Sequence, residues 1–513
     1  MFSSPQHHNE VRLAPRRHCR DQWPPHARRR LRGRRSAEKL AAVVEDFRAS
    51  PPSLAVVVLL LLGSSAARGS IGGADARGDG HRDSIRSGIR GDPPAGGQAT
   101  PPTIRAALIG PSIGPSNRAS KPAPAPATRL VLLRNNSLGA KCLDGSPPGY
   151  YFRRGKGAGR ASWHVHLPVG AWCLDEPSCL RRSRSRLGST TYWAANAAAA
   201  AGRRGKSYPS FTGLLSPSSG VNPAFHAWNL VWLVYCDGGG YTSTRGRVNV
   251  GGNRSVHMDG WNIVQAVMQD LRQKRGMAAP ARILLSGSSA GGQAVVMLCD
   301  RVAAAFPAAS TKCFADAAFL ADARDRFGQY RWRDMVRQIA SLHQINIPSC
   351  PKGASSEGPW MCFFPQYALP TVATPIFIYQ SLFDLTLIEH GNQLGSNRVY
   401  SIKCLKDELF QQQPNVSYLV ERKMWDQVAW KDRFCTPEER IALLTMASTV
   451  YSELRDIVTV GSSTVGAYIV NSLNHAVIAS KDWGSLSVRG MRLRSVFTNW
   501  YLDWSKQSVF IDD

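Results

Sequence analysis

The chain has 513 residues, 43% of them hydrophobic, and a formal net charge of +27 at neutral pH. The hydrophobic fraction is typical of a globular protein and excludes a chain that is disordered throughout, and the length allows one large core with appended segments. The positive charge favours an anionic partner such as nucleic acid, an anionic lipid surface or a uronic-acid polysaccharide. Arginines cluster between Arg12 and Arg48, but the rest of the chain is also basic.

Residues 1–128 are predicted to form a disordered, basic extension that contains a signal-peptide-like segment at about 50–68. The apolar run LAVVVLLLL follows basic residues and precedes small ones, as in a signal peptide. It is too short to cross a bilayer, which takes about 20 residues. Since a signal peptide begins near the start of a chain, we expect translation to start after Met1; an arginine-rich head before an internal signal is the alternative. A nuclear or RNA-binding arm at RRRLRGRR is a competing interpretation, but it leaves the apolar run unexplained.

Residues 63 to about 128 are rich in glycine, alanine, proline, arginine and serine. This stretch has too few large apolar residues to offset the entropy lost when a chain becomes ordered. We therefore interpret it as a linker and expect a compact domain over residues 129–513.

Ten of the eleven cysteines lie between Cys142 and Cys435, without the spacing of a zinc site. This distribution favours disulfides in an oxidising compartment, and buried thiols are the alternative. Three Asn-x-Ser sequons agree with secretion: Asn135, Asn253 and Asn415. Short sequence separation suggests three disulfide pairs: Cys173–Cys179, Cys299–Cys313 and Cys350–Cys362.

The pattern G-x-S-x-G, typical of a nucleophile elbow, occurs twice. The copy GPSIG lies in the linker, with neither a strand before it nor a helix after it, and we interpret it as chance. The copy GSSAG follows the strand-like run RILLS and precedes a helix-forming stretch. It predicts Ser289 as the nucleophile, with the amide of Ala290 facing a developing oxyanion. A turn without chemistry is the alternative.

The triad of such a fold runs in the order serine, acid, histidine, with the last two in loops after later strands. After Ser289 the chain has three histidines, and the order favours His475, which follows the strand-like run GAYIVNSLNH. His343 precedes the expected acid, and His390 follows it by only six residues.

The strand-like run PIFIYQSLFD delivers Asp384 as the acid. Asp316 and Asp322 are weaker candidates, because no clear strand brings either to the active edge of a sheet. In this interpretation the acid orients the imidazole, which takes the proton of the serine and returns it to the leaving alcohol. Neither a cofactor nor a metal is needed. The other oxyanion donors are expected from PVGAWC after the strand WHVHL, at the amides of Ala171 and Trp172.

These residues lie in a chain that resembles the plant pectin acetylesterases, which are related to the Notum-type carboxylesterases. The resemblance spans about residues 130–505 and is carried by motifs in the same order: GAKCLDGSPPGYYF, GAWC, FTGLLS, VNPAFHAWN, YCDGG, LLSGSSAGG, CFADAAFL, CFFPQY and YIVNSLNH. It implies an α/β-hydrolase-like fold with a mostly parallel central sheet flanked by helices, and an extracellular location in the cell wall. It also maps the family's nucleophile, acid and base onto Ser289, Asp384 and His475. Trp172 would contact a sugar or acetyl group, or belong to the core.

The chain departs from the family pattern around the triad. The family has Glu-Gly-Gly-Gly-Trp-Cys where this chain has Pro-Val-Gly-Ala-Trp-Cys, and a positive φ at Val169 would strain the turn by about 1–3 kcal/mol. Ser288, Leu473 and Ala476 replace family cysteines, and the cysteine-rich tail is missing after Ile511. Residues 405–434 look like an insertion between two family cysteines.

The sequence thus predicts a secreted serine esterase that removes O-acetyl groups from pectin, acting as a monomer without nucleic acid or a stable membrane span. Two alternatives stay open. One is an esterase for another acylated glycan or a lipid ester. The other is a glycan-binding pseudoenzyme whose altered turn over residues 168–171 has lost its oxyanion donors.

Overall fold

The structure is a computed structural model that describes residues 128–201, 209, 211–325, 327–345, 347, 350, 357–391, 437–461, 464–503 and 509–511. The chain divides into two units, Met1–Arg105 with Asp513 and Ala106–Asp512, and all described residues belong to the second. The predicted extension with its signal-peptide-like segment lies outside the described residues, apart from residue 128. So do the insertion at 405–434 and the sequon at Asn415.

Nine of the described strands form one sheet in the order β1-β2-β4-β3-β7-β8-β9-β10-β13. Their bounds are β1 Arg129–Leu132, β2 Gly149–Arg153, β3 Ser162–Leu167, β4 Asn229–Leu233, β7 Arg282–Ser288, β8 Ser310–Asp316, β9 Ile376–Ser381, β10 Val465–Val470 and β13 Val509–Ile511. β2 pairs antiparallel with both β1 and β4, and every pairing from β4 to β13 is parallel. Two short antiparallel pairs stand apart: β5 Gly246–Asn249 with β6 Ser255–Met258, and β11 Ser487–Val488 with β12 Met491–Arg492.

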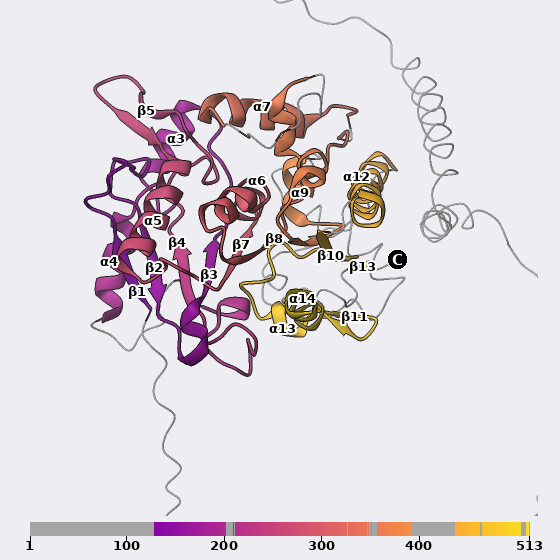
Figure 1. Cartoon of the computed structure of the whole chain (residues 1–513). Helices are drawn as coiled ribbons and strands as arrows, with labels where there is room; N and C mark the ends of the chain where they lie inside the picture. The colour runs from indigo at the N-terminus through magenta and orange to yellow at the C-terminus, as the bar shows by residue number, and fades with distance from the viewer. Residues whose placement is uncertain are drawn as a thin grey trace, which may run out of the picture. The chain divides into compact units, whose positions relative to one another are not determined.

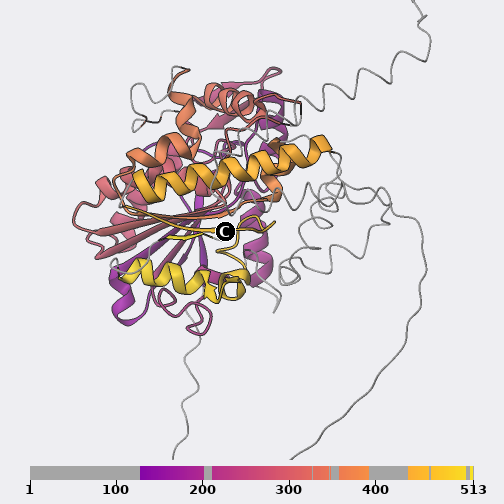
Figure 2. The same cartoon turned by 90° about the vertical axis from the view of Figure 1, so that its right-hand side faces the viewer.

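Helices cover both faces of this sheet (Figure 1). Their bounds are α3 Glu176–Ser183, α4 Thr191–Ala201, α5 Gly260–Lys274, α6 Ala290–Ala305, α7 Arg331–His343, α8 Pro365–Ala368, α9 Leu385–Gly391, α12 Pro437–Asp456, α13 Asp482–Ser485 and α14 Leu493–Leu502. In Figure 2, α12 lies over one face of the sheet and α14 over the other. The predicted α/β-hydrolase-like fold with a mostly parallel sheet and flanking helices is confirmed. Among the described residues, no helix has both the length and the apolar character that a bilayer crossing requires.

Aromatic side chains fill the space between the sheet and α14. Phe314 of β8 and Phe377 of β9 pack on Phe497 of α14, with ring centroids 4.4 Å and 5.4 Å apart, and all three are fully buried. Burying an aromatic side chain contributes about 1.5–3 kcal/mol. This cluster fixes the central strands, whose carboxyl ends carry the predicted site.

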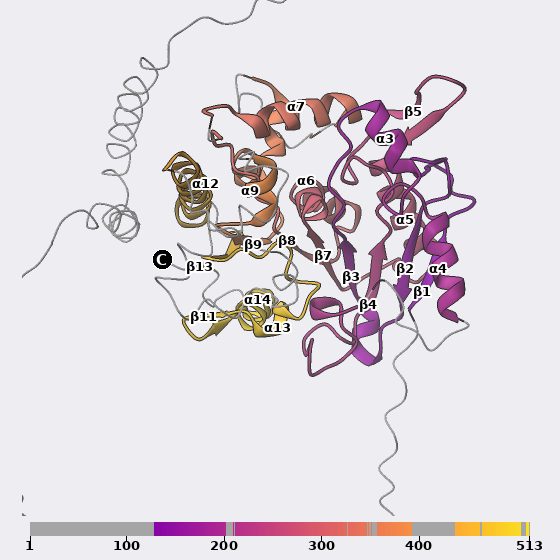
Figure 3. The same ribbon diagram turned by 180° about the vertical axis from the view of Figure 1, so that it is seen from behind.

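The predicted functional residues follow neighbouring strands. Ser289 comes directly after β7, Asp384 three residues after β9, and His475 five residues after β10. Because β7, β8, β9 and β10 are adjacent and parallel, their carboxyl ends meet at one edge of the sheet (Figure 3). The fold therefore gathers three segments that are far apart in the sequence.

Two histidines are buried inside the sheet beside the nucleophile strand. His164 and His166 of β3 both hydrogen-bond the hydroxyl of Ser286 of β7, at 2.7 Å and 2.9 Å. Burial lowers the pKa of His166 to about 3 and that of His164 well below its usual value. Both imidazoles are therefore neutral in the folded protein at pH values where an unfolded chain protonates them.

We expect the free energy of unfolding to fall as pH decreases below about 6.5, the unperturbed histidine pKa. Below that pH the two histidines bind protons in the unfolded chain but stay neutral in the folded sheet. Each histidine therefore lowers the free energy of unfolding by up to about 1.4 kcal/mol per pH unit, until the pH reaches its folded pKa, which is about 3 for His166. Urea unfolding at pH 7, 6 and 5 measures this slope. The double variant His164→Gln/His166→Asn should reduce the slope, with His226→Asn, at a partly exposed histidine, as the control. An equal slope in the double variant would contradict this account.

Candidate functional site

Ser289 lies in a strained turn between strand β7 and helix α6. Its backbone has φ 58° and ψ −126°, a conformation that costs an ordinary residue about 1–3 kcal/mol and is typical of functional turns. Its side chain is partly exposed, while Ser288 before it and Ala290 after it are buried. The turn therefore presents one hydroxyl at the edge of the sheet, as a nucleophile elbow does.

The glycines of this motif are required by close backbone approach. A Cβ on Gly287 would lie 2.2 Å from the carbonyl oxygen of Gly291, and one on Gly291 would lie 2.0 Å from the carbonyl oxygen of Leu167. No side chain fits at either position. The start of α6 is thereby pressed against the end of β3, where the predicted oxyanion turn begins.

Asp384 and His475 form a direct hydrogen-bonded pair. Nδ1 of His475 donates to the carboxylate of Asp384, at 2.9 Å from Oδ1 and 2.8 Å from Oδ2. The carboxylate is 1% exposed and also accepts from the amides of Thr386 and Leu387. A proton fixed on Nδ1 leaves Nε2 with a lone pair, which is the tautomer that a general base needs. The imidazole is 23% exposed and so lies within reach of solvent.

The hydroxyl of Ser289 and the imidazole of His475 do not share a hydrogen bond in the described part of the chain. Such contacts are commonly long before substrate binds. Instead, one residue bridges the two segments: Asp316, whose carbonyl oxygen accepts from the amide of Ser289 at 2.8 Å. Its carboxylate accepts from the amides of Val477 and Ile478, at 3.1 Å and 3.2 Å, two and three residues after the histidine.

This position of Asp316 corrects one sequence-based expectation. We expected no clear strand to deliver it to the active edge, but β8 ends on this residue. Its carboxylate also accepts from the hydroxyl of Ser288 at 2.6 Å. Burial raises its pKa to about 6, against the lowering effect of these hydrogen bonds. Asp316 thus joins the elbow to the histidine loop, whereas the imidazole bonds Asp384. The other alternative acid, Asp322, pairs with Arg333 at 2.6 Å.

The turn over residues 168–173 differs from the expectation in where it bends. Ala171, not Val169, has the left-handed conformation, with φ 50°. Val169 is 48% exposed, so its side chain needs no space inside the protein. Gly170 is required, because a Cβ there would lie 2.5 Å from the ring of Tyr235.

Trp172 was expected either to contact the substrate or to belong to the core, and its position fits neither description completely. It is partly buried and packs edge-on against Phe363, with ring centroids 5.6 Å apart. Its indole nitrogen would lie 2.7 Å from a Cβ on Gly240, whose other neighbour is the carbonyl of Ala290. The indole of Trp172 and the carbonyl of Ala290 thus both lie near Gly240, close to the elbow.

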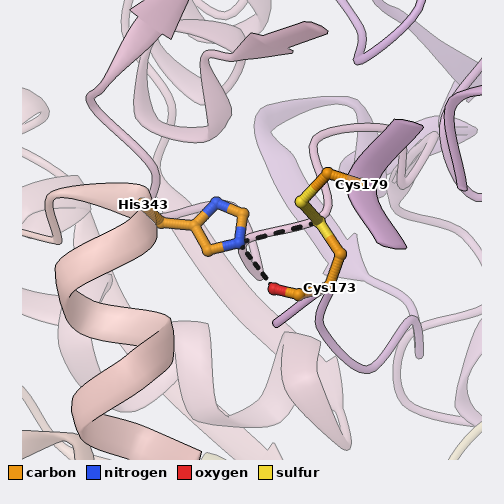
Figure 4. A group of neighbouring side chains, drawn as sticks. All are labelled: Cys173, Cys179 and His343. Atoms are coloured by element: carbon orange, nitrogen blue, oxygen red, sulfur yellow. Dashed lines mark hydrogen bonds between the residues drawn. A yellow bond between two sulfur atoms is a disulfide. The ribbon is translucent and has the colours of Figure 1, made fainter. Parts of the chain in front are cut away.

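Cys173, Cys179 and His343 form the one group with metal-ligand geometry among the described residues (Figure 4). The two sulfurs are joined in a disulfide. Metal binding by cysteine requires thiolates, which a disulfide does not offer. The group is therefore a disulfide contacted by a buried imidazole.

The three short-range disulfide predictions are confirmed: Cys173–Cys179, Cys299–Cys313 and Cys350–Cys362. A fourth disulfide, Cys142–Cys236, has a sequence separation of 94 and was not predicted. Pairing cysteines that are close in sequence could not identify this disulfide, because only the folded sheet brings the ends of the two segments together.

Comparison with known proteins identifies the family of the chain. The pectinacetylesterase family model matches residues 123–512. The chain belongs to the pectinacetylesterase family. Pectin acetylesterase 7 of Arabidopsis thaliana is 35% identical over 282 residues, which is 53% of this chain and 68% of that relative. Pectin acetylesterase 5 of the same plant is 33% identical over 281 residues, 54% of this chain and 62% of the relative.

The family is related to NOTUM carboxylesterases. The human palmitoleoyl-protein carboxylesterase NOTUM is 31% identical over 275 residues, 50% of this chain and 51% of that protein. The chain thus spans between about half and two thirds of the length of these relatives. The relatives named for pectin acetyl esters and for a palmitoleoyl ester share one chemistry in their names, carboxylic ester hydrolysis.

Replacing each of the two buried acids in turn, Asp384 and Asp316, should separate their roles. In Asp384→Asn the carboxamide no longer fixes the tautomer or stabilises an imidazolium, so we expect kcat for p-nitrophenyl acetate to fall by about a thousandfold to ten-thousandfold. In Asp316→Asn, where the imidazole keeps its partner, we expect kcat to stay within about tenfold. Steady-state kinetics at pH 7.5 with folding checked by circular dichroism decides this. A larger loss in Asp316→Asn than in Asp384→Asn would contradict the assignment of Asp384 as the triad acid.

Proposed function

We propose that this protein is a secreted serine carboxylic-ester hydrolase that removes O-acetyl groups from pectin. The observation that carries the proposal is the hydrogen bond between Nδ1 of His475 and Asp384, on the sheet edge that also carries the strained elbow of Ser289. Family membership supports the ester chemistry. No metal or cofactor enters the proposed reaction.

In the proposed mechanism the hydroxyl of Ser289 attacks the acetyl carbonyl while Nε2 of His475 accepts its proton. The Asp384 carboxylate stabilises the imidazolium that forms. The amides of Ala290, Ala171 and Trp172 would donate to the developing oxyanion. The imidazolium then protonates the leaving sugar oxygen, and water repeats the sequence on the acetyl-enzyme to release acetate.

The charge of the chain supports an anionic polysaccharide as substrate. Pectin is a polymer of galacturonate, and the chain is also basic outside the arginine cluster between Arg12 and Arg48, which raises the local concentration of a polyanion near the protein. Two relatives are named pectin acetylesterases. The relation to NOTUM keeps a lipid ester as the second candidate.

The pseudoenzyme alternative depends on lost oxyanion donors. The turn that departs from the family pattern keeps glycine at position 170, where the ring of Tyr235 excludes a side chain. Its left-handed residue is an alanine, at a cost of about 1–2 kcal/mol, rather than a β-branched valine. This geometry supports an intact turn and therefore favours the enzyme.

Replacing the nucleophile tests the proposal. Ser289→Ala should lower acetate release from acetylated pectin by about four to six orders of magnitude, because no acyl-enzyme can form. Ser112→Ala, in the second copy of the same motif, is the matched control and should release acetate at the wild-type rate. Equal release by Ser289→Ala and wild type would remove Ser289 as the nucleophile.

Comparing hydrolysis rates on different esters distinguishes the proposed function from its two alternatives. Faster hydrolysis of acetylated xylan or of a p-nitrophenyl fatty ester than of acetylated pectin would favour the other esterase. Binding of homogalacturonan without hydrolysis of any ester would favour the pseudoenzyme.

Secretion should leave glycans on the exposed sequons. Asn135 and Asn253 are both exposed and lie in turns, where an oligosaccharide meets no packed surface. Protein made in a plant secretory host should lose mass on treatment with an N-glycosidase. Asn253→Gln should lose one glycan, and Asn196→Gln, outside a sequon, should lose none. Unglycosylated protein recovered from the medium would contradict this prediction.

A further inference from the structure

Side chains from three other segments bind successive carbonyl groups of the 168–173 turn. Nη1 of Arg182 donates to the carbonyl of Gly170 at 2.6 Å, and its Nη2 donates to that of Trp172 at 2.9 Å. The hydroxyl of Tyr235 donates to the carbonyl of Ala171. Nε2 of His343 donates to the carbonyl of Cys173 at 3.0 Å. Four consecutive carbonyls are therefore held by the protein interior.

Carbonyl direction fixes amide direction. In a trans peptide the C=O of one residue and the N–H of the next point in opposite directions. With the carbonyls of Gly170 and Ala171 bound by Arg182 and Tyr235, the amides of Ala171 and Trp172 point away from those side chains. These two amides are the proposed oxyanion donors.

Within the part of the chain that the structure describes, the guanidinium of Arg182 donates hydrogen bonds to main-chain carbonyls only. Among the described residues no carboxylate forms an ion pair with it, although Glu176 of the same helix pairs with another arginine, Arg245. A planar guanidinium has donors in a fixed fork and can hold two carbonyls at once, which a lysine ammonium does less well. Its two bonds span the left-handed residue Ala171, whose φ of 50° is unfavourable for alanine.

The helix that carries Arg182 is itself fastened to the turn. The disulfide Cys173–Cys179 joins the last residue of the turn to α3 across six positions. Asp175 caps α3, and its side chain accepts from the amide of Ser178 at 2.6 Å. Figure 4 shows the imidazole of His343 directed at the disulfide and at the carbonyl of Cys173. Burial lowers the pKa of His343 to about 4, so this donor stays neutral.

We propose that Arg182 is a positioning residue for the oxyanion hole, and that the disulfide Cys173–Cys179 sets its reach by anchoring α3 to the turn. The proposal rests on the proposed esterase function. Arg182 would act through the backbone, since its guanidinium faces the carbonyl side of the turn and the substrate would meet the amide side. Loss of the guanidinium or of the disulfide would let the turn relax toward a conformation in which the two amides no longer converge.

Truncating Arg182 tests the first part. In Arg182→Met we expect kcat for p-nitrophenyl acetate to fall about tenfold to a hundredfold with KM within about threefold, because oxyanion donors act in the transition state. Added guanidinium should restore part of kcat, and ethylammonium should restore less. Arg181→Met, at an exposed arginine of the same helix, is the matched control and should behave as wild type. A change in KM alone, or equal losses in both variants, would overturn the proposal.

A double-mutant cycle tests the anchoring. Removing the disulfide in Cys173→Ala/Cys179→Ala should lower kcat, and adding Arg182→Met should lower it little further, because the two act as one unit. The matched control disulfide is Cys299–Cys313, and its removal should combine additively with Arg182→Met. Additive effects of Arg182→Met with loss of Cys173–Cys179 would overturn the anchoring role.

An amide signal decides the proposal independently of catalysis. In protein labelled with carbonyl-13C glycine and 15N alanine only Gly–Ala pairs are detected, which includes the amide of Ala171. Its chemical shift should move in Arg182→Met and stay in Arg181→Met. If wild-type protein hydrolyses no ester, the proposed function fails while this shift still tests the positioning. An unmoved shift in Arg182→Met would overturn it.

Discussion

A buried carboxylate, that of Asp316, joins the segments that carry the proposed nucleophile and base. It accepts hydrogen bonds from Ser288 in the elbow and from the amides of Val477 and Ile478 after the histidine. Its own carbonyl accepts from the amide of Ser289. Four donors from two distant segments therefore converge on one residue at the end of β8. A carboxylate in a fully buried position requires such donors, because an unpaired one is strongly disfavoured. The relative position of the elbow and the histidine loop follows from this requirement.

Small residues with unusual backbone conformations surround this junction, because the converging segments determine their geometry. Ser289, Ala317 and Ala476 all have positive φ, and each stands at or directly beside a proposed catalytic or bridging residue. Each conformation costs about 1–3 kcal/mol and persists only where surrounding contacts determine it. Gly287 and Gly291 add the close backbone approach that brings α6 against β3. The strain is thus concentrated where strands end and side chains must be aimed, and the aromatic core beneath the sheet stabilises it.

The sequence predicted the four strands β3, β7, β9 and β10, because each is a local apolar pattern followed by a turn, and the resemblance to the pectin acetylesterases predicted the fold class. The local pattern could not predict the role of Asp316, since all four of these hydrogen bonds come from residues at least 27 positions away. The role of Arg182 was missed for a different reason. It lies only ten positions from Trp172, but in the sequence it belongs to a run of arginines whose members cannot be told apart without the fold. The disulfide Cys142–Cys236 likewise depends on tertiary contact rather than spacing.

The altered turn shows how a departure from a family pattern can be compatible with its chemistry. Glycines allow unusual backbone angles but do not specify them, and their flexibility must be restricted by other contacts. In this chain proline and valine occupy the positions with ordinary angles, glycine remains where the Tyr235 ring allows no side chain, and alanine takes the one left-handed position. The carbonyl contacts of Arg182, Tyr235 and His343 then select a single arrangement of the peptide planes. Fewer glycines reduce the entropy lost on ordering the turn. An oxyanion turn of this composition therefore depends less on glycine and more on the side chains that bind its carbonyls.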